Sequence, residues 1–391
     1  MKHYFFILYI PYITIFINIK ASHITLPFHH HFTQTKQRAS AIMVQNKKFI
    51  YKQIPQGEPV AGKDLVIETS EFDIDQAPPA GGVTVKNIYA SLDPYQRGRM
   101  RDPSIKSYMP AWNVNDPVNG GVISKVIKSD HSNYKEGDLV AGFGSYTEYS
   151  ALPKQQADGL KKLPHNEKID PVNYSGPLGM PGLTAYSSLY EIGKPQKGET
   201  IFISSAAGAV GALVGQIAKH EGLRVVGSVG SEEKLKYITE ELGFDGGFNY
   251  KEEKPLDALK RLCPDGIDIY FENVGGEQLE ASLTLMNQNG RIIVCGMISD
   301  YNKAPEERYG IKNLMQLISQ RLTVRGFLVG DKDFGPKYEK ERTEKVSDWL
   351  ADGSFKAKLH VTKGIDNGPE AFLGMLSGKN FGKAVLQIGE L

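Results

Sequence analysis

The amino-acid sequence predicts an α/β protein in which a β-rich first part precedes a doubly wound parallel sheet. From about residue 47 to residue 171, short β-branched runs alternate with Gly and Pro, and helical periodicity is nearly absent. Closely spaced strands separated by turn residues are typical of a small barrel or sandwich. From about residue 175, strands of the buried type alternate with helical stretches, which indicates a parallel sheet covered by helices.

The expected elements follow from hydrophobic periodicity. In the first part, half-buried strands are expected at residues 82–89, 120–127 and 138–143. In the second part, strands are expected at residues 200–204, 223–229, 248–250, 267–271, 291–295 and 322–329. Helices are expected between them at residues 210–220, 232–242, 278–286 and 311–320, and after them at residues 337–350. We predict a first domain over residues 43–174, a second over residues 175–353, and an extended, turn-rich return to the first domain over residues 354–391.

Composition excludes several classes of protein. The 391 residues include 46 Lys and Arg against 45 Asp and Glu, a formal net charge of +1, which argues against a strongly basic nucleic-acid binder. The two cysteines, Cys263 and Cys295, form no C-x-x-C pair, so a disulfide framework and a Cys-rich zinc site are excluded. No cluster of Cys, His and acidic residues supports a catalytic zinc, and we expect no metal.

The first 42 residues differ from the rest. Residues 4–19 form a 16-residue apolar run that is interrupted by Pro11. A membrane-spanning helix needs about 20 apolar residues, so this run is short, although it could be the core of a signal peptide. We favour a disordered or dispensable tail, or translation from Met43, over a targeting segment. The expected location is therefore cytoplasmic, with membrane association or the secretory pathway as the alternative if the segment is a real anchor.

A glycine-containing turn follows the first strand of the second part. Residues 205–211 read SAAGAVG, which places Ala206, Gly208 and Gly211 at the three key positions of G-x-G-x-x-G. The middle Gly lets backbone N–H groups approach a pyrophosphate, and the last lets the helix pack closely on the strand. Because the turn lies between a strand and a helix, as this motif requires, we predict a dinucleotide-binding site.

The end of the second strand indicates which dinucleotide binds. An NAD site places an acid there, about 20 residues after the glycines, to hold the ribose 2′-OH. Residues 226–231 read VGSVGS and contain no acid, while Lys234 follows and Tyr250 ends the next strand. Two Glu residues come directly after Ser231, but acids are favoured in the first turn of a helix that Ser231 caps. Small hydroxyl residues and a cation suit a 2′-phosphate, so we predict NADP(H).

Other catalytic signatures are missing or misplaced. There is no G-x-S-x-G elbow, and residues 378–384 mimic a P-loop that is one residue short and lacks its Ser or Thr. Tyr190 and Lys194 have the spacing of a Tyr-x-x-x-Lys pair but precede the glycine turn, so we interpret Tyr190 as helix packing.

Four motifs together resemble the zinc-independent medium-chain dehydrogenases/reductases, and among them the NADP-dependent alkenal/one oxidoreductases. They are PGLTAY at 181–186, AAGAVG at 206–211, FENVGG at 271–276 and CGMIS at 295–299. The resemblance runs from about Val44 to the C-terminus. It implies a GroES-like barrel domain joined to a Rossmann domain, an active site between them, and a homodimer.

The resemblance implies NADPH-dependent reduction of the C=C bond of α,β-unsaturated ketones and aldehydes, without zinc, by hydride transfer to the β-carbon. Two alternatives stay open. One is a quinone reductase of the same superfamily, and the other is a dinucleotide-binding protein that has lost activity.

The resemblance also implies roles for residues at matching positions. The pyrophosphate would be held by Gly208, Ala209, Val210 and Gly211, and the 2′-phosphate by Lys234 and Tyr250. The ribose and nicotinamide side would be lined by Asn273, Cys295, Gly296, Ser299, Tyr301, Phe327, Leu328 and Val329. Asn380 would reach back from the tail to the cofactor, and Tyr95, in Asp93-Pro94-Tyr95, would face the substrate. For Asn273 and Tyr95, turn capping and core packing stay open as alternatives.

One position departs from the family. Many members carry a Tyr shortly before the last long Rossmann strand and assign it a role at the substrate oxygen, whereas this chain has Ser319. A Ser hydroxyl is shorter and far less acidic than a phenol, which argues against a Tyr-like proton role. Reduction can proceed without it if the enolate is held by a cofactor hydroxyl or solvent and water protonates the α-carbon.

Overall fold

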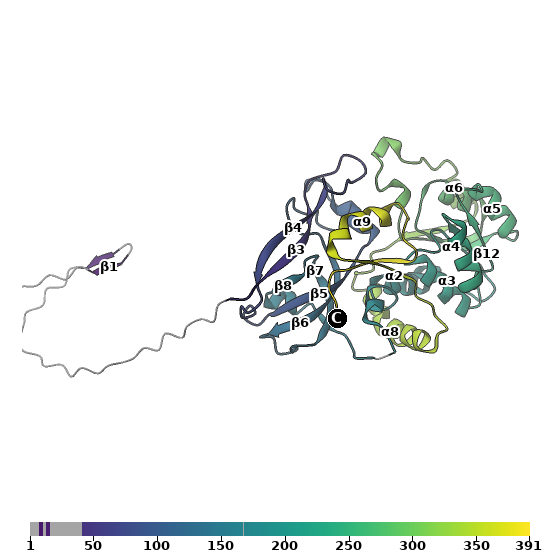
Figure 1. The fold of residues 1–391 in the computed structure, drawn as a ribbon. Helices are drawn as coiled ribbons and strands as arrows, with labels where there is room; N and C mark the ends of the chain where they lie inside the picture. Colours follow the sequence, from purple (N-terminus) through teal and green to yellow (C-terminus); the bar gives the residue numbers. More distant parts are fainter. Residues whose placement is uncertain (1–7, 11–12, 16–40, 167) are drawn as a thin grey trace, which may run out of the picture. The chain divides into compact units, whose positions relative to one another are not determined.

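The structure, a computed structural model, describes residues 8–10, 13–15, 41–166 and 168–391 (Figure 1). The chain divides into two units, Met1–Ala41 and Ile42–Leu391, and each is described by itself. In the first unit, β1 (Leu8–Ile10) pairs antiparallel with β2 (Ile13–Ile15). Apart from these two strands and residues 41–42, the tail, signal or anchor predicted for residues 1–42 lies outside the described residues. Within the described ranges, no helix combines the length and the apolar character needed to cross a membrane.

The first lobe of the second unit is built from antiparallel strands. Strand β3 (Met43–Tyr51) pairs with β4 (Leu65–Asp73). A seven-stranded sheet has the order β16-β17-β5-β6-β7-β9, and β8 also pairs with β5. Its strands from this part of the chain are β5 (Val83–Ser91), β6 (Asn119–Ser129), β7 (Leu139–Ser145), β8 (Tyr149–Leu152) and β9 (Lys161–Lys162). The predicted strands at residues 82–89, 120–127 and 138–143 are therefore confirmed.

The C-terminal tail adds two strands to this sheet. Strand β16 (Leu359–Lys363) pairs parallel with β17 (Lys383–Gln387), and β17 pairs antiparallel with β5. Between them lies helix α9 (Gly368–Leu376), whose Phe372 packs into the same core as Phe49 and Trp112. An extended tail was expected, so the prediction is wrong for residues 368–376. The domain boundaries themselves stay a prediction.

The second lobe is a six-stranded parallel sheet. The strand order is β12-β11-β10-β13-β14-β15. The chain first adds strands on one side of β10 and then, from β13 on, on its other side, as in Rossmann folds. The strands are β10 (Thr200–Ile203), β11 (Arg224–Val229), β12 (Gly246–Asn249), β13 (Ile267–Glu272), β14 (Met286–Val294) and β15 (Thr323–Gly326). Ile201, Phe202 and Ile203 of β10 are completely buried because helices cover both faces. The predicted α/β class, with a doubly wound sheet and a β-rich first lobe, is confirmed.

Helices and short turns complete the unit. In the second lobe they are α2 (Met180–Ser188), η3 (Leu189–Gly193), α3 (Gly211–His220), α4 (Glu232–Lys236), η4 (Tyr237–Glu241), α5 (Pro255–Leu262), α6 (Gly276–Leu285), η5 (Ile298–Asp300), η6 (Pro305–Glu307), α7 (Gln316–Ser319) and α8 (Gly335–Asp352). Elsewhere they are η1 (Pro94–Arg99), α1 (Lys154–Ala157), η2 (Pro171–Ser175) and η7 (Ile365–Asn367). Figure 1 shows α3, α4, α5 and α6 gathered around β12, away from β5 and β6.

Two predicted elements of the second lobe are too long. The helix expected at residues 311–320 forms only at Gln316–Ser319, because Asn313 instead bonds the Glu280 carbonyl at 2.8 Å and Thr284 at 2.9 Å on α6. The strand expected at residues 322–329 ends at Gly326, and a turn follows in which the Asp331 amide donates to the Leu328 carbonyl.

The packing of the C-terminal tail can be tested by substituting two of its glycines, which both have positive φ. At Gly378 (φ +69°) nothing lies within 4 Å of an added Cβ, whereas at Gly382 (φ +77°) a Cβ would sit 2.1 Å from the Lys358 carbonyl oxygen. Gly378→Ala should cost about 1–2 kcal/mol of folding free energy, the ordinary left-handed penalty. Gly382→Ala should cost clearly more, because the backbone must also move. Urea unfolding measures both, and equal losses would contradict this packing of the tail.

Candidate active site

The glycine turn lies between β10 and α3, as the sequence predicts. Ser205 adopts a φ of +52°, and the Gly208 amide closes the turn on the Ser205 carbonyl at 2.9 Å. A Cβ on Gly211 would lie 2.5 Å from that same carbonyl oxygen, so only glycine lets α3 approach the strand this closely. The ten-residue helix begins here, and its first N–H groups and dipole make this end suitable for an anion.

The predicted cation, Lys234, lies in the helix that follows the carboxyl end of β11. Ser231 caps α4, accepting the Lys234 amide at 3.3 Å, as predicted. The Lys234 ammonium donates to the Gly378 carbonyl at 2.8 Å, and the Tyr250 hydroxyl lies 3.1 Å from where a Cβ on Gly230 would sit. The pKa of Lys234 is lowered, first by burial and then by the positive charge of Lys251. Lys251 is therefore a second cation at this edge, which sequence reasoning missed although it directly follows Tyr250.

The tail reaches the glycine turn directly. The Gly382 amide donates to the Ala207 carbonyl at 3.2 Å, and Gly382 forms an isolated bridge with Gly208. Asn380, half-buried, donates its side-chain amide to the Gly382 carbonyl at 2.6 Å. Asn380 thus lies beside the turn, and its contact with a cofactor stays a prediction.

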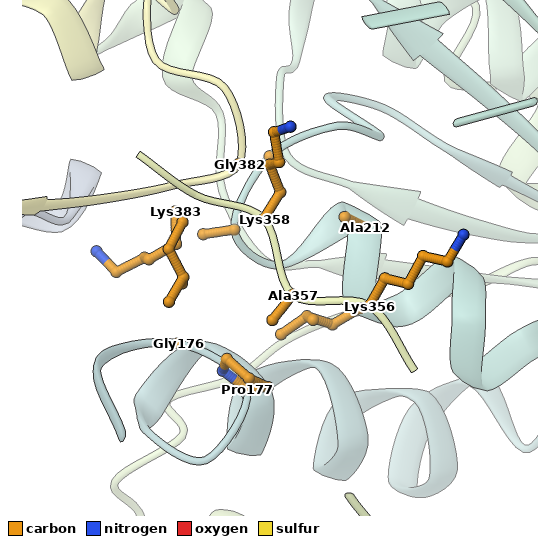
Figure 2. A pocket seen from close by; sticks show the side chains of 12 residues that line it. Gly176, Pro177, Ala212, Lys356, Ala357, Lys358, Gly382 and Lys383 are labelled. Carbon is orange, nitrogen blue, oxygen red and sulfur yellow. The ribbon is translucent and has the colours of Figure 1, made fainter. Parts of the chain in front are cut away.

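A small pocket opens beside the turn (Figure 2). It is lined by Gly176, Pro177, Gly208, Ala209, Ala212, Leu213, Lys356, Ala357, Lys358, Leu359, Gly382 and Lys383. Figure 2 shows the amines of Lys356 and Lys383 pointing away from each other on opposite sides of it. The pocket thus lies between the glycine turn, residues 176–177 and the tail segments 356–359 and 382–383.

A buried carboxylate shapes the turn after β13. Glu272 Oε1 accepts hydrogen bonds from the Val274 amide at 2.6 Å, the Gly275 amide at 2.8 Å and the Ser204 hydroxyl at 3.1 Å. Burial raises the pKa of Glu272. Sequence reasoning missed this residue because an acid at the end of a strand gives no signal of its own burial.

Asn273 joins this turn to β10. Its backbone amide donates to the Ser204 hydroxyl at 2.8 Å, and its side-chain amide donates to the Ser204 carbonyl at 2.7 Å. These bonds agree with the turn-capping alternative, and they also place Asn273 just before the glycine turn. A role at the cofactor ribose stays a prediction.

The segment after β14 brings the other nicotinamide-side residues together. The amides of Cys295 and Gly296 both donate to the Glu272 carbonyl, at 2.9 and 3.1 Å. The Ser299 amide donates to the Val274 carbonyl at 3.0 Å, and the Tyr301 hydroxyl lies 3.0 Å from where a Cβ on Gly296 would sit. Burial, with the nearby Glu272 charge, raises the pKa of Cys295 to about 12.

Three tyrosines, Tyr95 and Tyr108 of the first lobe and Tyr301 of the second, lie near one another. Burial raises the pKa of Tyr301 to about 12, and burial followed by Asp93 raises that of Tyr95. Tyr108 influences the pKa values of both, and Cys295 that of Tyr108 itself. A role of Tyr95 at the substrate stays a prediction, and so does its core-packing alternative. Sequence reasoning missed Tyr108, which lies in a polar loop without periodicity.

A hydrogen bond ties the helix of Tyr95 to the loop of Tyr301. Arg97, in η1, donates from Nε to the Asn302 side-chain oxygen at 2.7 Å and from Nη2 to the Gly57 carbonyl at 2.7 Å. The substrate-side and nicotinamide-side segments are therefore held beside each other.

Phe327, Leu328 and Val329 follow the carboxyl end of β15. Gly326 pairs with Val294, so this segment begins beside Cys295. The Phe327 ring stacks on Phe334 at 4.8 Å, and Leu328 is exposed. This position agrees with the place beside the nicotinamide that the family resemblance implies for these three residues.

Comparisons with known proteins match both lobes. The N-terminal domain of oxidoreductase family matches residues 47–160, and the zinc-binding dehydrogenase family matches residues 209–352. An NADP-dependent oxidoreductase of Cochliobolus heterostrophus is 53% identical over 89% of this chain and 99% of its own length. The NADP(+)-dependent 2-alkenal reductase of Nicotiana tabacum is 44% identical over 88% of this chain and 98% of its own.

The chain belongs to the zinc-independent medium-chain dehydrogenase/reductase family, in its NADP-dependent alkenal/one oxidoreductase branch. A solved structure agrees. CurA of Vibrio vulnificus in complex with NADPH is 34% identical, covers 88% of this chain and all of its own, and has a TM-score of 0.80.

Despite the name of the matched dehydrogenase family, no group of three or more His, Cys, Asp or Glu in the described ranges could hold a metal ion. The structure also fails to bring Ser319 to the site. Ser319 precedes β15, at the amino end of the sheet, where the Asn289 amide bonds the Gln320 carbonyl at 2.7 Å. It is exposed and bonds Gln316 at 2.9 Å, so within one chain it does not approach Tyr95.

Removing the Lys234 charge should separate the two nicotinamide cofactors. Lys234→Ala removes a charge-assisted contact worth about 1.5–3 kcal/mol, or roughly ten- to a hundred-fold in NADPH affinity. NADH lacks the 2′-phosphate and should bind almost as before, and Tyr250→Phe should act more weakly in the same direction. Cofactor titration by fluorescence measures this, with Lys236→Ala, an exposed lysine on the same helix, as control. Equal losses for both cofactors would refute the assignment.

Proposed function

We propose that the protein reduces the carbon–carbon double bond of α,β-unsaturated ketones and aldehydes, using NADP(H), at the site between Tyr95 and the segment of Cys295 and Tyr301. The observation that supports this best is the meeting of two features. One is a cofactor edge where Lys234 and Lys251 lie close together and β11 ends without an acid. The other is a group of three phenols, Tyr301 after β14 of the same sheet and Tyr95 and Tyr108 from the first lobe. The name of the 2-alkenal reductase points to the same reaction, and the name of the oxidoreductase to the same cofactor.

The residues present fit NADPH. Gly211 leaves no space for a side chain between turn and helix, and the α3 N-terminus would hold the pyrophosphate together with Gly208, Ala209 and Val210. Lys234, Lys251 and Tyr250 would hold the 2′-phosphate, and Asn380 would close the site from the tail. When bound, NADPH supplies the hydride that goes to the β-carbon of the substrate.

The protein's own contribution is orientation and charge stabilisation. As the β-carbon is reduced, negative charge develops on the carbonyl oxygen, where the Tyr95 hydroxyl would donate a hydrogen bond. A phenol is protonated at neutral pH even at its ordinary pKa of about 10, and burial raises the pKa of Tyr95 and Tyr301 further, so both would act as donors and not as bases. Since Ser319 lies at the other end of the sheet, the α-carbon would take its proton from water.

A substrate panel tests the reaction. With 4-deuterated NADPH, 2-alkenals and enones should give saturated carbonyl products labelled at the β-carbon, identified by mass spectrometry. Alcohol products with an intact alkene would refute the proposal. One-electron products from a quinone would favour quinone reduction instead. Parallel assays with NADH measure cofactor preference on the same substrates.

We also propose that the protein is a homodimer joined through β15. This strand is at the edge of the parallel sheet, and the apolar side chains of Val324 on it and of Met315 and Ile318 before it are exposed. An exposed apolar edge strand is a ready template for pairing with a second copy.

Charge on this edge should prevent pairing. Val324→Lys should shift the mass measured by light scattering from dimer to monomer, because a buried lysine would lie unpaired in the interface. Val60→Lys is a matched control, since Val60 is 49% exposed and Val324 is 47% exposed. A wild-type monomer, or a Val324→Lys variant that remains dimeric, would exclude this interface.

A further inference from the structure

Lys383 is a buried charged residue that the proposed reaction does not use. Its side chain is 3% exposed and that of Asp93 is 5% exposed, and the ammonium lies 3.0 Å from Asp93 Oδ1. The ammonium also donates to the carbonyls of Leu92 and of Ala384, the latter at 2.9 Å. Three acceptors around one ammonium satisfy all its donors, which is how a buried charge is tolerated.

The partner carboxylate organises the turn that carries Tyr95. Asp93 Oδ2 accepts the Ser91 hydroxyl at 2.6 Å, and the Asp93 amide donates to Gln96 Oε1 at 2.9 Å. Gln96 in turn donates to the Tyr146 hydroxyl at 2.7 Å, and both side chains are completely buried. The start of η1 is thus fixed on both sides of Tyr95, and Lys383 supplies the only charge opposite Asp93 among the described ion pairs.

The backbone of the same residue belongs to the cofactor side. Lys383 follows Gly382, whose amide bonds the Ala207 carbonyl of the glycine turn, and its own amide bonds the Lys358 carbonyl at 2.9 Å. Figure 2 shows its backbone beside Gly382, with its amine directed away from Ala212. Lys383 therefore connects the glycine turn, through its backbone neighbour Gly382, with the turn at Asp93, through its ammonium.

We propose that Lys383 is a positioning residue that sets the distance between the glycine turn, which holds the cofactor, and the Asp93-Pro94-Tyr95 turn, which holds the substrate. The Arg97–Asn302 bond also connects the lobes, but it lies at the far end of η1 from Asp93. Without the Lys383 ammonium, the start of η1 would keep its local bonds and the backbone pairing of β17 with β5, in which the Leu92 amide donates to the Ala384 carbonyl at 3.2 Å. Asp93 itself would lose its bond to the strand that follows Gly382. The catalytic part of this inference rests on the proposed enone reduction.

Hydride transfer is sensitive to such a distance, since a misplacement of about 1 Å can cost about a hundred-fold in rate. Lys383→Met removes the charge and keeps the length of the side chain. In single-turnover assays at saturating NADPH, it should reduce hydride transfer about ten- to a hundred-fold and raise the isotope effect on kcat with 4-deuterated NADPH. The dissociation constant of NADPH should stay unchanged, because the Gly382 backbone bond remains.

Lys219→Met is a control for the loss of a lysine ion pair elsewhere: Lys219, on α3 and 34% exposed, pairs with Asp245 at 2.9 Å. The double variant Lys383→Met with Asp93→Asn separates stability from positioning. Removing the unpaired carboxylate should restore Tm while the isotope effect stays raised. A normal isotope effect in the double variant, or losses in Lys383→Met no different from those in Lys219→Met, would overturn the proposal.

Hydrogen exchange of the protein without cofactor provides a readout that needs no turnover. Amides of residues 93–100 should exchange faster in Lys383→Met than in Lys219→Met, while the rest of the sheet exchanges alike. Unchanged exchange there would overturn the positioning role even if wild-type protein reduced every enone. Failure of the wild type to reduce any enone would instead refute the proposed function, and exchange would still decide the role of Lys383.

Discussion

The hydrogen bond from the Gly382 amide to the Ala207 carbonyl connects two sheets that have no strand in common. On one side of it, the parallel strands of the second lobe all end at one edge, so the turns after β10, β11, β13, β14 and β15 must meet there. On the other side, β17 continues into the antiparallel sheet beside β5, which leads into the turn of Tyr95. The site depends on this crossing, together with the Arg97–Asn302 bond, because cofactor residues and substrate residues otherwise belong to separate sheets.

Local patterns predicted much of this arrangement. Alternating side chains identified β5, β6 and β7, and the glycine turn with its flanking strand and helix identified the cofactor edge. The Ser231 cap was predictable because its hydroxyl satisfies an amide three residues later. Helix α2 was not, because it is buried on nearly all sides and so shows no apolar stripe. The contacts of Glu272, Tyr108 and Lys383 join segments far apart in the chain, and no local pattern announces them.

Burial has opposite uses in the two halves of the site. At the cofactor edge, Lys234 and Lys251 repel each other, which favours an anion between them. At the substrate side, burial keeps phenols and the Cys295 thiol in their neutral forms. With its pKa raised by burial, Cys295 is a neutral thiol at neutral pH. Because the thiolate is the reactive form, this thiol would be slow to add to an electrophilic alkene held beside it.

The contact of the C-terminal tail with the glycine turn also determines when, during synthesis of the chain, the cofactor site can form. Gly382 lies about 170 residues after the glycine turn it bonds, which at ribosomal rates is roughly 10–35 s of synthesis. During that time the parallel sheet can form from its own strands, but its cofactor turn lacks the tail, and the sheet around β5 lacks β17. The nascent chain therefore has an antiparallel sheet without β17 and a glycine turn without its contact to Gly382, and the same late segment completes both. Completion of the binding site and completion of the fold become one event.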